Sequence, residues 1–571
     1  MRQEVTDILI LGAGGAGLLA ALHARERAPD ARIAIAVKGL LGKCGCTRMV
    51  QGGYNVALAA EDSVERHFRD TIEGGQWLND QDLAWTLVNT APQRVRELEN
   101  RWGCFFDRNA DGTLHQKAFA GQTFDRTVHK GDLTGIEIVN RLAEQVRGAG
   151  IDRFEDHRAV ALIPSQDGTT IAAVLLIDIR SGGFVLVRAK AVLLATGGGP
   201  TMYRYNTPSG DKSCDGLAMA LRVGLELRDM EMVQFHPTGL LAGEDTRMTG
   251  TVLEEGLRGA GGHLLDGAGN RFMEEFDPRG ERATRDIVSR AIIEIVRAGR
   301  GAPGGGVHLR MNHLGPDNVR KQFKGMVERC ADCGFDLAGG LVEVIPTAHY
   351  LMGGVVFRPD GRTAMAGLFA AGEDTGGVHG ANRLGGNGVA NSTVFGGIAG
   401  EAMAAWIAGR ALAEADSKRI RGAEAEARRP LGGAEGDLDG LRRRLQALMW
   451  DDVGILREQS GLEHAEALLQ VLETELDFIG VPEAPAYNLA WHDWLNLRNQ
   501  ILVSRAITAA ALQRRNSAGA HWRADHPQHP DAGASRHTLV CLDGDRLMAS
   551  DAPVRFTRLS PQPPGGQLVS A

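Results

Sequence analysis

The residue pattern with the clearest chemistry is a glycine-rich turn close to the N-terminus. Residues 12–17 read Gly-Ala-Gly-Gly-Ala-Gly, between an apolar run at 7–11 and a stretch of helix-forming composition at 18–24. A G-x-G-x-x-G pattern allows a tight turn, the approach of a pyrophosphate and close packing of a helix on a strand, and the helix N-terminus supplies N–H donors. A structural turn without a ligand is the alternative. Strand and helix lie where a dinucleotide site needs them, so we predict cofactor binding at Gly12, Gly14, Gly15, Ala16 and Gly17.

Two further apolar runs end in glycines much later in the chain. The run at 191–195 leads into Thr196-Gly197-Gly198, and the run at 367–372 leads into Glu373, which places a carboxylate near a second phosphate or ribose position. The run at 33–37 predicts another strand and ends in Lys38, where an acid usually binds the ribose of NAD. This departure disfavours plain NAD, and Lys38 stays a candidate cofactor-binding residue.

The three junctions between an apolar strand and glycines lie far apart in the chain. They fit one dinucleotide domain that an inserted domain divides. A chain of 571 residues is also too long for a single hydrophobic core. Beyond residue 405 the composition becomes rich in Ala, Glu and Arg with helical spacing, and the last residues are rich in Pro and Gly. We therefore predict a dinucleotide domain in two parts, at 1–230 and 346–405, with an inserted domain at 231–345 between them. A linker and helix follow at 406–440, then a helical C-terminal domain at 441–552 and a loose tail at 553–571.

Composition and charge exclude several classes of protein. The formal net charge of −8 gives no electrostatic footprint for nucleic acid. The chain enters an apolar strand without a signal sequence, and no apolar run approaches the ~20 residues of a membrane span, so we expect a cytoplasmic protein without direct membrane insertion. Seven cysteines in this length are no disulfide framework. Cys330-Ala-Asp-Cys333 and Cys44-Gly-Cys46 lack complementary His or Cys pairs, so we predict no metal site, and a redox-active disulfide is the alternative.

Ordered motifs along nearly the whole chain resemble one family, the flavoprotein subunits of succinate dehydrogenase and fumarate reductase, which includes L-aspartate oxidase. The motifs are Gln51-Gly-Gly, Gln234-Phe-His-Pro-Thr-Gly, Glu255-Gly-Leu-Arg-Gly, Arg285-Asp-Ile-Val-Ser-Arg, His349-Tyr-Leu-Met-Gly-Gly, His379-Gly-Ala-Asn-Arg-Leu and Ser517-Ala-Gly-Ala-His. The resemblance implies an α/β fold, in which an α+β capping domain interrupts a Rossmann-like FAD-binding domain and a helical domain follows.

The resemblance also implies the reaction and its catalytic residues. Reduction of a substrate such as fumarate takes a hydride from flavin N5 and a proton from a general acid on the opposite face. Arg285 would be that acid, and Glu255 and Arg258 would return the proton to it. An arginine acid is unusual because its free pKa lies above 12, so it must be held against the substrate and reprotonated by a carboxylate. In isolation, Arg285 and Asp286 would be a surface ion pair on a helix.

By the same resemblance, other residues would bind substrate. His236, His349 and Arg383 would bind its carboxylates, Arg383 in a bidentate manner, and Phe119 would pack over it. Taken singly, His236 before a proline could be a turn residue and His349 a core residue with its hydrogen bonds satisfied.

Further cofactor residues follow from the resemblance, with one departure. They are Cys46, Thr47, Gln51, Gly52, Gly53, Asp215 and Asn387. The respiratory enzymes carry FAD covalently on a histidine in Ser-His-Thr, but this chain has Gly45-Cys46-Thr47 there. We therefore expect FAD to be bound non-covalently, with a cysteinyl–flavin bond as the alternative.

Two departures concern the substrate. Glu254 stands where the family has a hydroxyl that contacts a substrate carboxylate, so either its side chain is turned away or the substrate is not a simple C4 dicarboxylate. Ala260 and Ala518 replace a glutamate and an arginine of the family.

Three hypotheses remain from the sequence. The first is a fumarate reductase or succinate dehydrogenase-like flavoprotein that uses an iron–sulfur partner, at the inner membrane through that partner, or a soluble reductant. The second is an L-aspartate oxidase-like enzyme or one that reduces a related carboxylate. The third is an electron-transfer module without its own catalysis, which the full set of Arg285, His349 and Arg383 disfavours.

Overall fold

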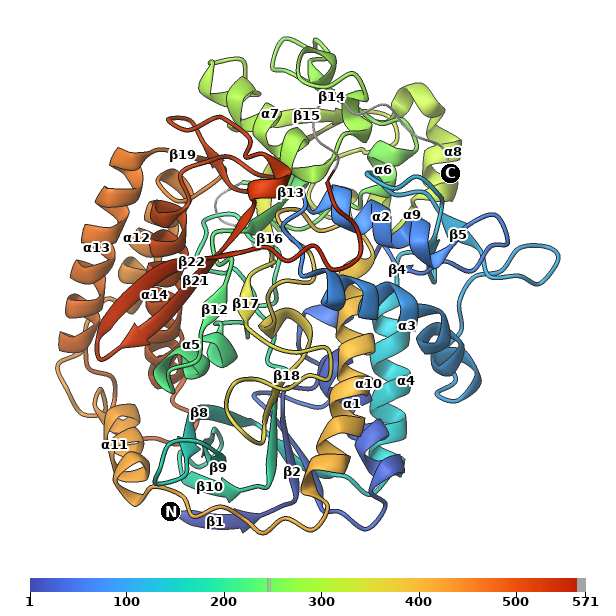
Figure 1. Cartoon of the computed structure of the whole chain (residues 1–571). Coiled ribbons are helices and arrows are strands. Elements are labelled where there is room, and N and C mark those ends of the chain that lie inside the picture. Colours follow the sequence, from blue (N-terminus) through green and yellow to red (C-terminus); the bar gives the residue numbers. More distant parts are fainter. Residues whose placement is uncertain (244–245, 247, 562–571) are drawn as a thin grey trace.

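A five-stranded parallel sheet forms the centre of the molecule and is built from distant parts of the chain (Figure 1). The computed structural model describes residues 1–243, 246 and 248–561. The strand order is β18 (Leu368–Ala370), β11 (Ala191–Leu194), β2 (Ile8–Leu11), β3 (Ile33–Val37) and β7 (Asp152–Glu155). Four of these are the strands that the apolar runs predict, and all four are buried because helices cover the sheet.

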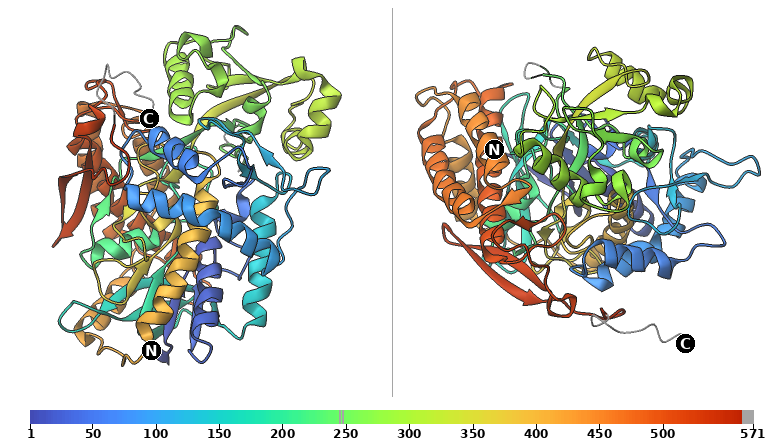
Figure 2. Two further views of the ribbon diagram at one scale, coloured as in Figure 1. Left: turned by 45° about the vertical axis from the view of Figure 1, so that its right-hand side comes forward. Right: turned by 90° about the horizontal axis from the view of Figure 1, so that it is seen from above.

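Helices pack around this part of the molecule, and α1 and α10 begin at the carboxyl edge of the sheet. They are α1 (Gly15–Arg27), α2 (Val64–Gly74), α3 (Gln81–Asn100), α4 (Thr134–Gly148), α5 (Asp215–Arg222) and α10 (Asn387–Ile407). Helices α1 and α10 lie side by side (Figures 1 and 2). A Cβ at Gly396 would lie 2.4 Å from the backbone oxygen of Ala16, so only glycine lets the two helices approach this closely.

Two smaller sheets extend this part of the molecule. One has the order β1 (Arg2–Val5), β10 (Phe184–Arg188), β9 (Ile171–Asp178) and β8 (His157–Pro164). The other has the order β4 (Tyr54–Asn55), β6 (Thr127–Val128) and β5 (Gln116–Lys117). Short 3-10 turns, η1 (Cys46–Met49) and η5 (Gly372–Asp374), follow β3 and β18.

The inserted segment forms its own sheet and core. The sheet has the order β13 (Val233–Leu240), β16 (Leu341–Leu351), β15 (Val307–Arg310) and β14 (His263–Leu265), and the helices are α6 (Gly256–Gly259), α7 (Arg285–Arg297), α8 (Pro316–Gln322) and α9 (Lys324–Ala331). Short 3-10 turns are η2 (Met273–Glu275), η3 (Gly280–Arg282) and η4 (Asn312–Leu314). A separate cluster of buried apolar residues fills it. This unit lies at the top of Figure 1 as an α+β cap on the central domain, as the fold class predicts.

The C-terminal region forms a helical domain that packs along one side of the central domain (Figure 2). Its elements are α11 (Ser417–Arg428), α12 (Leu438–Asp451), α13 (Gln459–Phe478), α14 (Leu489–Gln513), β19 (Leu456–Arg457), β20 (Trp522–Arg523), η6 (Ala532–Ala534), β21 (Arg536–Asp543) and β22 (Arg546–Pro553). Strands β21 and β22 form a hairpin that extends the sheet of β17 (Gly354–Val355) and β12 (Leu227–Arg228). After it, Leu559 hydrogen-bonds with Gln81 of α3 through both backbone groups. Part of the predicted tail, 562–571, lies outside the described residues, and the predicted domain boundaries remain predictions.

Candidate active site

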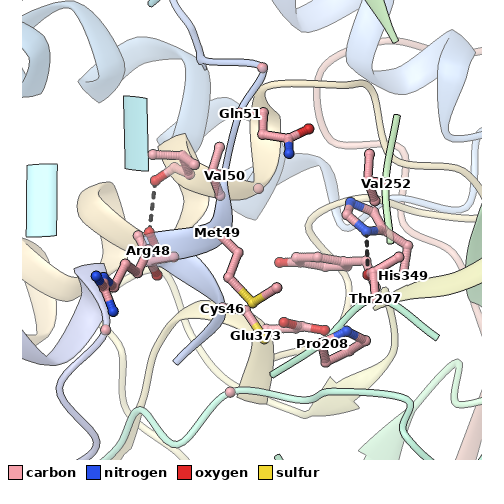
Figure 3. Close-up of a pocket in the computed structure, with 18 of the residues that line it drawn as sticks. Cys46, Arg48, Met49, Val50, Gln51, Thr207, Pro208, Val252, His349 and Glu373 are labelled. Carbon is pink, nitrogen blue, oxygen red and sulfur yellow. Dashed lines mark hydrogen bonds between the residues drawn. The ribbon is translucent and has the colours of Figure 1, made fainter. Parts of the chain in front are cut away.

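A cavity of about 510 Å³ lies at the carboxyl edge of the central sheet, between the central domain and the cap (Figure 3). The N-terminus of α1, the turn η1, the residues around η5 and the start of α10 line one part of it. Strands β13 and β16 and the N-terminus of α7 line the other part. Ligands of open α/β sheets bind at this edge, so the cavity is where the sequence places a dinucleotide and its substrate.

The glycine-rich turn forms one wall of the cavity. Gly14, Gly15 and Ala16 line it, and the N-cap residue Gly14 has no side chain to cap α1, so backbone N–H groups there other than that of Gly15 can face an anion. Gly12 has a φ of 109°, and a Cβ there would lie 2.1 Å from the Ala195 oxygen. A Cβ at Gly17 would lie 2.0 Å from the Gly12 oxygen, so Gly17 serves the packing of helix on strand and does not line the cavity.

A second, smaller cavity of about 50 Å³ continues from this wall. Gly12, Lys38 and Asp215 line it, and the Lys38 Nζ lies 2.8 Å from the Asp215 Oδ2. Lys212, which the sequence analysis missed, lines both cavities and donates to the Thr196 oxygen at 2.6 Å. Its ammonium adds positive charge where the two cavities meet, as a bound pyrophosphate requires.

The two later glycine junctions hold each other in place. Asp374 accepts hydrogen bonds from the backbone N–H groups of Thr196 at 2.5 Å and Gly197 at 3.1 Å. Glu373 lines the cavity and accepts from the Leu351 N–H at 3.0 Å. Burial raises the pKa of Glu373 to about 7 and that of Asp374 to about 6. Gly198 packs on Glu373 and does not line the cavity, so its part is to leave room for that carboxylate.

The segment after β3 forms a further wall. Cys46, Thr47, Gln51, Gly52 and Gly53 all line the cavity. Thr47 Oγ1 accepts from the Gly15 N–H at 3.2 Å and so joins this segment to α1. Burial raises the pKa of Cys46 to about 11, which favours the thiol over the nucleophilic thiolate at neutral pH.

Asn387 lies at the start of α10 but does not line the cavity. Its side chain hydrogen-bonds with His67 at 3.0 Å and accepts from Asn55 at 2.9 Å. It therefore holds the loop that leads into the helix, and contact of its side chain with cofactor stays a prediction.

An arginine and a carboxylate meet on the cap side of the cavity. Arg285 is the first residue of α7, is buried, and donates to Glu255 Oε2 from Nε at 2.9 Å and from Nη2 at 2.6 Å. Glu255 Oε1 lies 3.8 Å from Arg258 Nη2, and Arg258 lies behind it, away from the cavity. Burial alone would raise the pKa of Glu255, but the charges of Arg285 and Arg258 hold it below its usual value. Arg285, Glu255 and Arg258 thus form a chain of three charged groups. The partner of Arg285 is Glu255 in the cavity wall, and not its neighbour Asp286 on the same helix.

Gln234 holds Arg285 from a second side. Its Oε1 accepts from Arg285 Nη1 at 3.1 Å, and its Nε2 donates to the Arg383 oxygen at 2.7 Å. No role was predicted for Gln234 from the sequence, although this residue begins the motif that contains His236.

Two histidines and a second arginine converge on the same space. The rings of His236 and His349 are 5.5 Å apart, and the pKa of each is held well below its usual value by burial and by nearby arginines. Both therefore present neutral imidazoles at physiological pH. His349 bonds through Nδ1 with Thr207 at 2.8 Å (Figure 3). Arg383 lies 4.5 Å from the ring centre of Tyr350, and burial lowers its pKa to about 10, so it remains charged.

Phe119 and Glu254 complete the lining. A Cβ at Gly52 would lie 2.5 Å from the Phe119 ring, so glycine is needed where the two meet. Glu254 faces the cavity and is not turned away from it. Its Oε2 accepts from Lys117 Nζ at 3.4 Å. No local pattern in the sequence points to Lys117, because that pairing joins segments 137 residues apart.

The fold and the donor set define a FAD-dependent oxidoreductase. Within the described residues, no group of three or more His, Cys, Asp or Glu side chains could hold a metal ion, and no helix is long and apolar enough to cross a membrane. A FAD binding domain model matches residues 7–389, and a fumarate reductase flavoprotein C-terminal model matches residues 442–565. The chain belongs to the fumarate reductase and succinate dehydrogenase flavoprotein family.

Individual relatives agree with this membership over almost the full chain. One subunit of the fumarate reductase (CoM/CoB) of Methanothermobacter marburgensis is 40% identical over 91% of this chain and 94% of its own. The L-aspartate oxidase of Streptomyces coelicolor is 35% identical over 95% of this chain and 92% of its own. A structure of Escherichia coli quinol fumarate reductase superposes with a TM-score of 0.92 at 32% identity and covers 99% of both chains.

Proposed function

We propose that the protein interconverts fumarate and succinate at the described cavity, with Arg285 as the proton donor. The observation that carries this proposal is the position of Arg285, held at the cavity wall by Glu255 on one side and Gln234 on the other. A guanidinium fixed from two sides has its remaining N–H groups aimed by its surroundings, as general acid catalysis needs.

The remaining lining supports binding of a small dicarboxylate. Arg383 supplies a permanent charge, and His236 and His349 supply neutral N–H donors. Together they would bind the two carboxylates and hold the carbon–carbon double bond beside Arg285, while Phe119 covers it. When bound, FAD supplies the hydride for reduction or accepts it for oxidation.

Proton return would follow the chain of charges. After Arg285 donates a proton, Glu255, which contacts two of its nitrogens, would take up a proton from solvent and pass it to Arg285. Arg258 stabilises the carboxylate of Glu255 from behind. Positioned proton transfer of this kind contributes about 10²–10⁴-fold to a rate.

Cofactor binding would use the glycine-rich turn, the segment 46–53 and the junctions at Thr196 and Glu373. We propose that FAD is held non-covalently, because Cys46 remains a thiol. Lys38 and Asp215 would lie at the far end of the dinucleotide and Lys212 near its pyrophosphate.

We further propose that an iron–sulfur subunit exchanges electrons with the flavin and brings the chain to a membrane. The names of the relatives as subunits of fumarate reductases support a partner. A soluble reductant would be the alternative source of electrons.

Anaerobic reoxidation tests the proposed reaction. Protein reduced with dithionite should return to the oxidised flavin spectrum on addition of fumarate, and Arg285→Gln should bind fumarate without reoxidation. A reduced wild type that fumarate leaves unchanged would remove fumarate as the substrate.

A second candidate, oxidation of L-aspartate, follows from Glu254. A carboxylate in the cavity could accept hydrogen bonds from a substrate ammonium, and one relative is named an L-aspartate oxidase. Anaerobic L-aspartate would then bleach the oxidised flavin, whereas under our first proposal succinate does so and L-aspartate does not.

A further inference from the structure

Glu254 is an acidic group where the proposed substrate brings negative charge. Its side chain is 8% exposed and lines the cavity. Within the part of the chain that the structure describes, Lys117 is the one donor to its carboxylate, through a single contact at 3.4 Å to Oε2. The carboxylate therefore keeps most of its lone pairs available to a ligand.

The backbone places Glu254 at the same end of the cavity as His236. Leu253 donates to the Thr238 oxygen at 2.9 Å, and Thr238 Oγ1 donates to the Leu253 oxygen at 2.8 Å. Thr238 follows His236 by two residues on β13, so the segment that ends in Glu254 runs beside that histidine. A dicarboxylate bound by His236 would bring one carboxylate towards Glu254.

The charges around Glu254 do not fully compensate a carboxylate. Lys117 of β5 faces it directly, whereas Arg329 of α9 donates to the Val252 oxygen at 3.0 Å and, with the amide suitably oriented, to Gln51 at 3.0 Å. Asp132 lies near enough to oppose ionisation. Burial raises the pKa of Glu254, and Lys117 lowers it only in part. A second anion in the cavity would favour the neutral form further.

We propose that Glu254 binds the dicarboxylate in its neutral form, so that one proton enters the site with the substrate. The inference rests on the proposed function. The carboxylate of Glu254 takes a proton from solvent, and the new O–H donates to a carboxylate oxygen of the substrate. No bond of the substrate changes in this step. Glu254 thereby does what a neutral hydroxyl could do at that place, and its repulsion of the substrate is removed.

Calorimetry of fumarate binding tests this step. Oxidised holoenzyme cannot reduce fumarate, so binding can be measured without turnover at pH 8 in phosphate and in Tris, whose ionisation enthalpies differ. The dependence of the binding enthalpy on buffer gives the number of protons taken up. We expect wild type to take up nearly one proton more than Glu254→Gln, whose amide is neutral at every pH.

The variants separate Glu254 from other groups in the cavity. His236 and His349 could also gain protons on binding, but their contribution is common to wild type and Glu254→Gln and cancels in the difference. Wild-type affinity should fall up to tenfold per pH unit above the pKa of Glu254, and the variant should lack this slope.

Removal of the Lys117 charge gives a second test of the protonation of Glu254. In Lys117→Met the pKa of Glu254 in the free protein should rise, so proton uptake on binding should also fall while fumarate still binds. This reading stays available if Glu254→Gln fails to fold.

Each result decides a different question. Equal proton uptake by wild type and Glu254→Gln overturns the inference and leaves the proposed function standing. A FAD-loaded wild type that does not bind fumarate overturns the proposed function, and this inference with it.

Discussion

At the scale of single residues, the chemistry of Arg285 depends on the groups that hold it. Its two contacts to Glu255 and one to Gln234 fix the guanidinium without neutralising its remaining donors. A lysine could keep the charge but not the planar fork that satisfies both partners at once. The arginine is therefore specific to its place, and a change there should act on proton transfer alone.

Replacement of Arg285 tests this reasoning. Arg285→Lys and Arg285→Gln should lower kcat by about 10²–10⁴-fold while FAD content and fumarate affinity stay largely intact. Steady-state rates and perturbation of the flavin spectrum measure the two quantities. Arg297→Gln, an exposed arginine on the same helix, is the matched control and should keep wild-type kcat. An Arg285 variant that retains more than a tenth of kcat contradicts the role.

Cys46 is the second residue with a direct test. With its pKa raised to about 11 by burial, the thiol does not ionise near neutral pH. Acid precipitation should release intact FAD into the supernatant, and Cys46→Ser should keep wild-type FAD content. Flavin fluorescence that stays with the denatured chain on a gel would show a covalent bond.

The structure brings together residues that belong to ordered motifs, whose roles remain predictions, and it adds pairings across the fold that the sequence did not indicate. Arg285, Glu255, His236 and His349 lie together because their motifs belong to one sheet of the cap and to the starts of its helices α6 and α7. No sequence motif contains Lys117, because its role follows from its contact with Glu254, which lies in the cap.

At the scale of elements, the first strand–turn–helix unit has no tolerance for a side chain at Gly12. With a φ of 109° and the Ala195 oxygen 2.1 Å from an added Cβ, Gly12→Ala would combine backbone strain with a clash. We expect loss of bound FAD and a lower melting temperature, read from the flavin absorbance and from thermal denaturation.

Gly148 provides the matched control for Gly12. It ends α4, is exposed, and has no atom within 4 Å of an added Cβ. Gly148→Ala should leave FAD content unchanged and alter stability by less than about 1 kcal/mol. Equal behaviour of the two variants would show that the turn is not tightly packed.

Four strands of the central sheet were predictable because each is a short apolar run that ends in glycine or a charged residue, whereas β7 has the sequence Asp-Arg-Phe-Glu and gives no such pattern. The hairpin of β21 and β22 was not, since β22 alternates between partly buried and exposed residues of mixed polarity. Strand β21 of the hairpin pairs with β12, which lies more than 300 residues earlier in the chain. Long-range pairing, and not local pattern, therefore determines where the hairpin forms.

At the scale of the whole molecule, buried charges join the C-terminal helices to the central domain. Arg514, at the end of α14, donates to Glu231 and, at 3.2 Å, to Asp229, and both acids are buried. His537 of the hairpin lies 2.7 Å from the other oxygen of Asp229. The interface thus depends on one arginine shared between two carboxylates.

Removal of that arginine should be costly. Arg514→Met leaves the buried Glu231 without its charge partner and Asp229 with its His537 contact; about 3–5 kcal/mol is typical for a broken buried pair, and we expect a clear fall in melting temperature. Arg515→Met, the exposed neighbour, should melt as wild type does. Identical melting curves for the two variants would show that the pair contributes no net stability.

The order of strands in the central sheet also has a consequence for biosynthesis. Strand β2 is among the first residues made, but β18, which completes its sheet beside β11, and the start of α10, which closes the cofactor cavity, follow only after residue 367. At 5–20 residues per second the ribosome needs roughly 20–75 s to reach that point. During that time apolar strands wait without their final neighbour. The nascent chain therefore exposes apolar surface that is prone to aggregation over that time, and the flavin can be loaded only after most of the polypeptide has emerged.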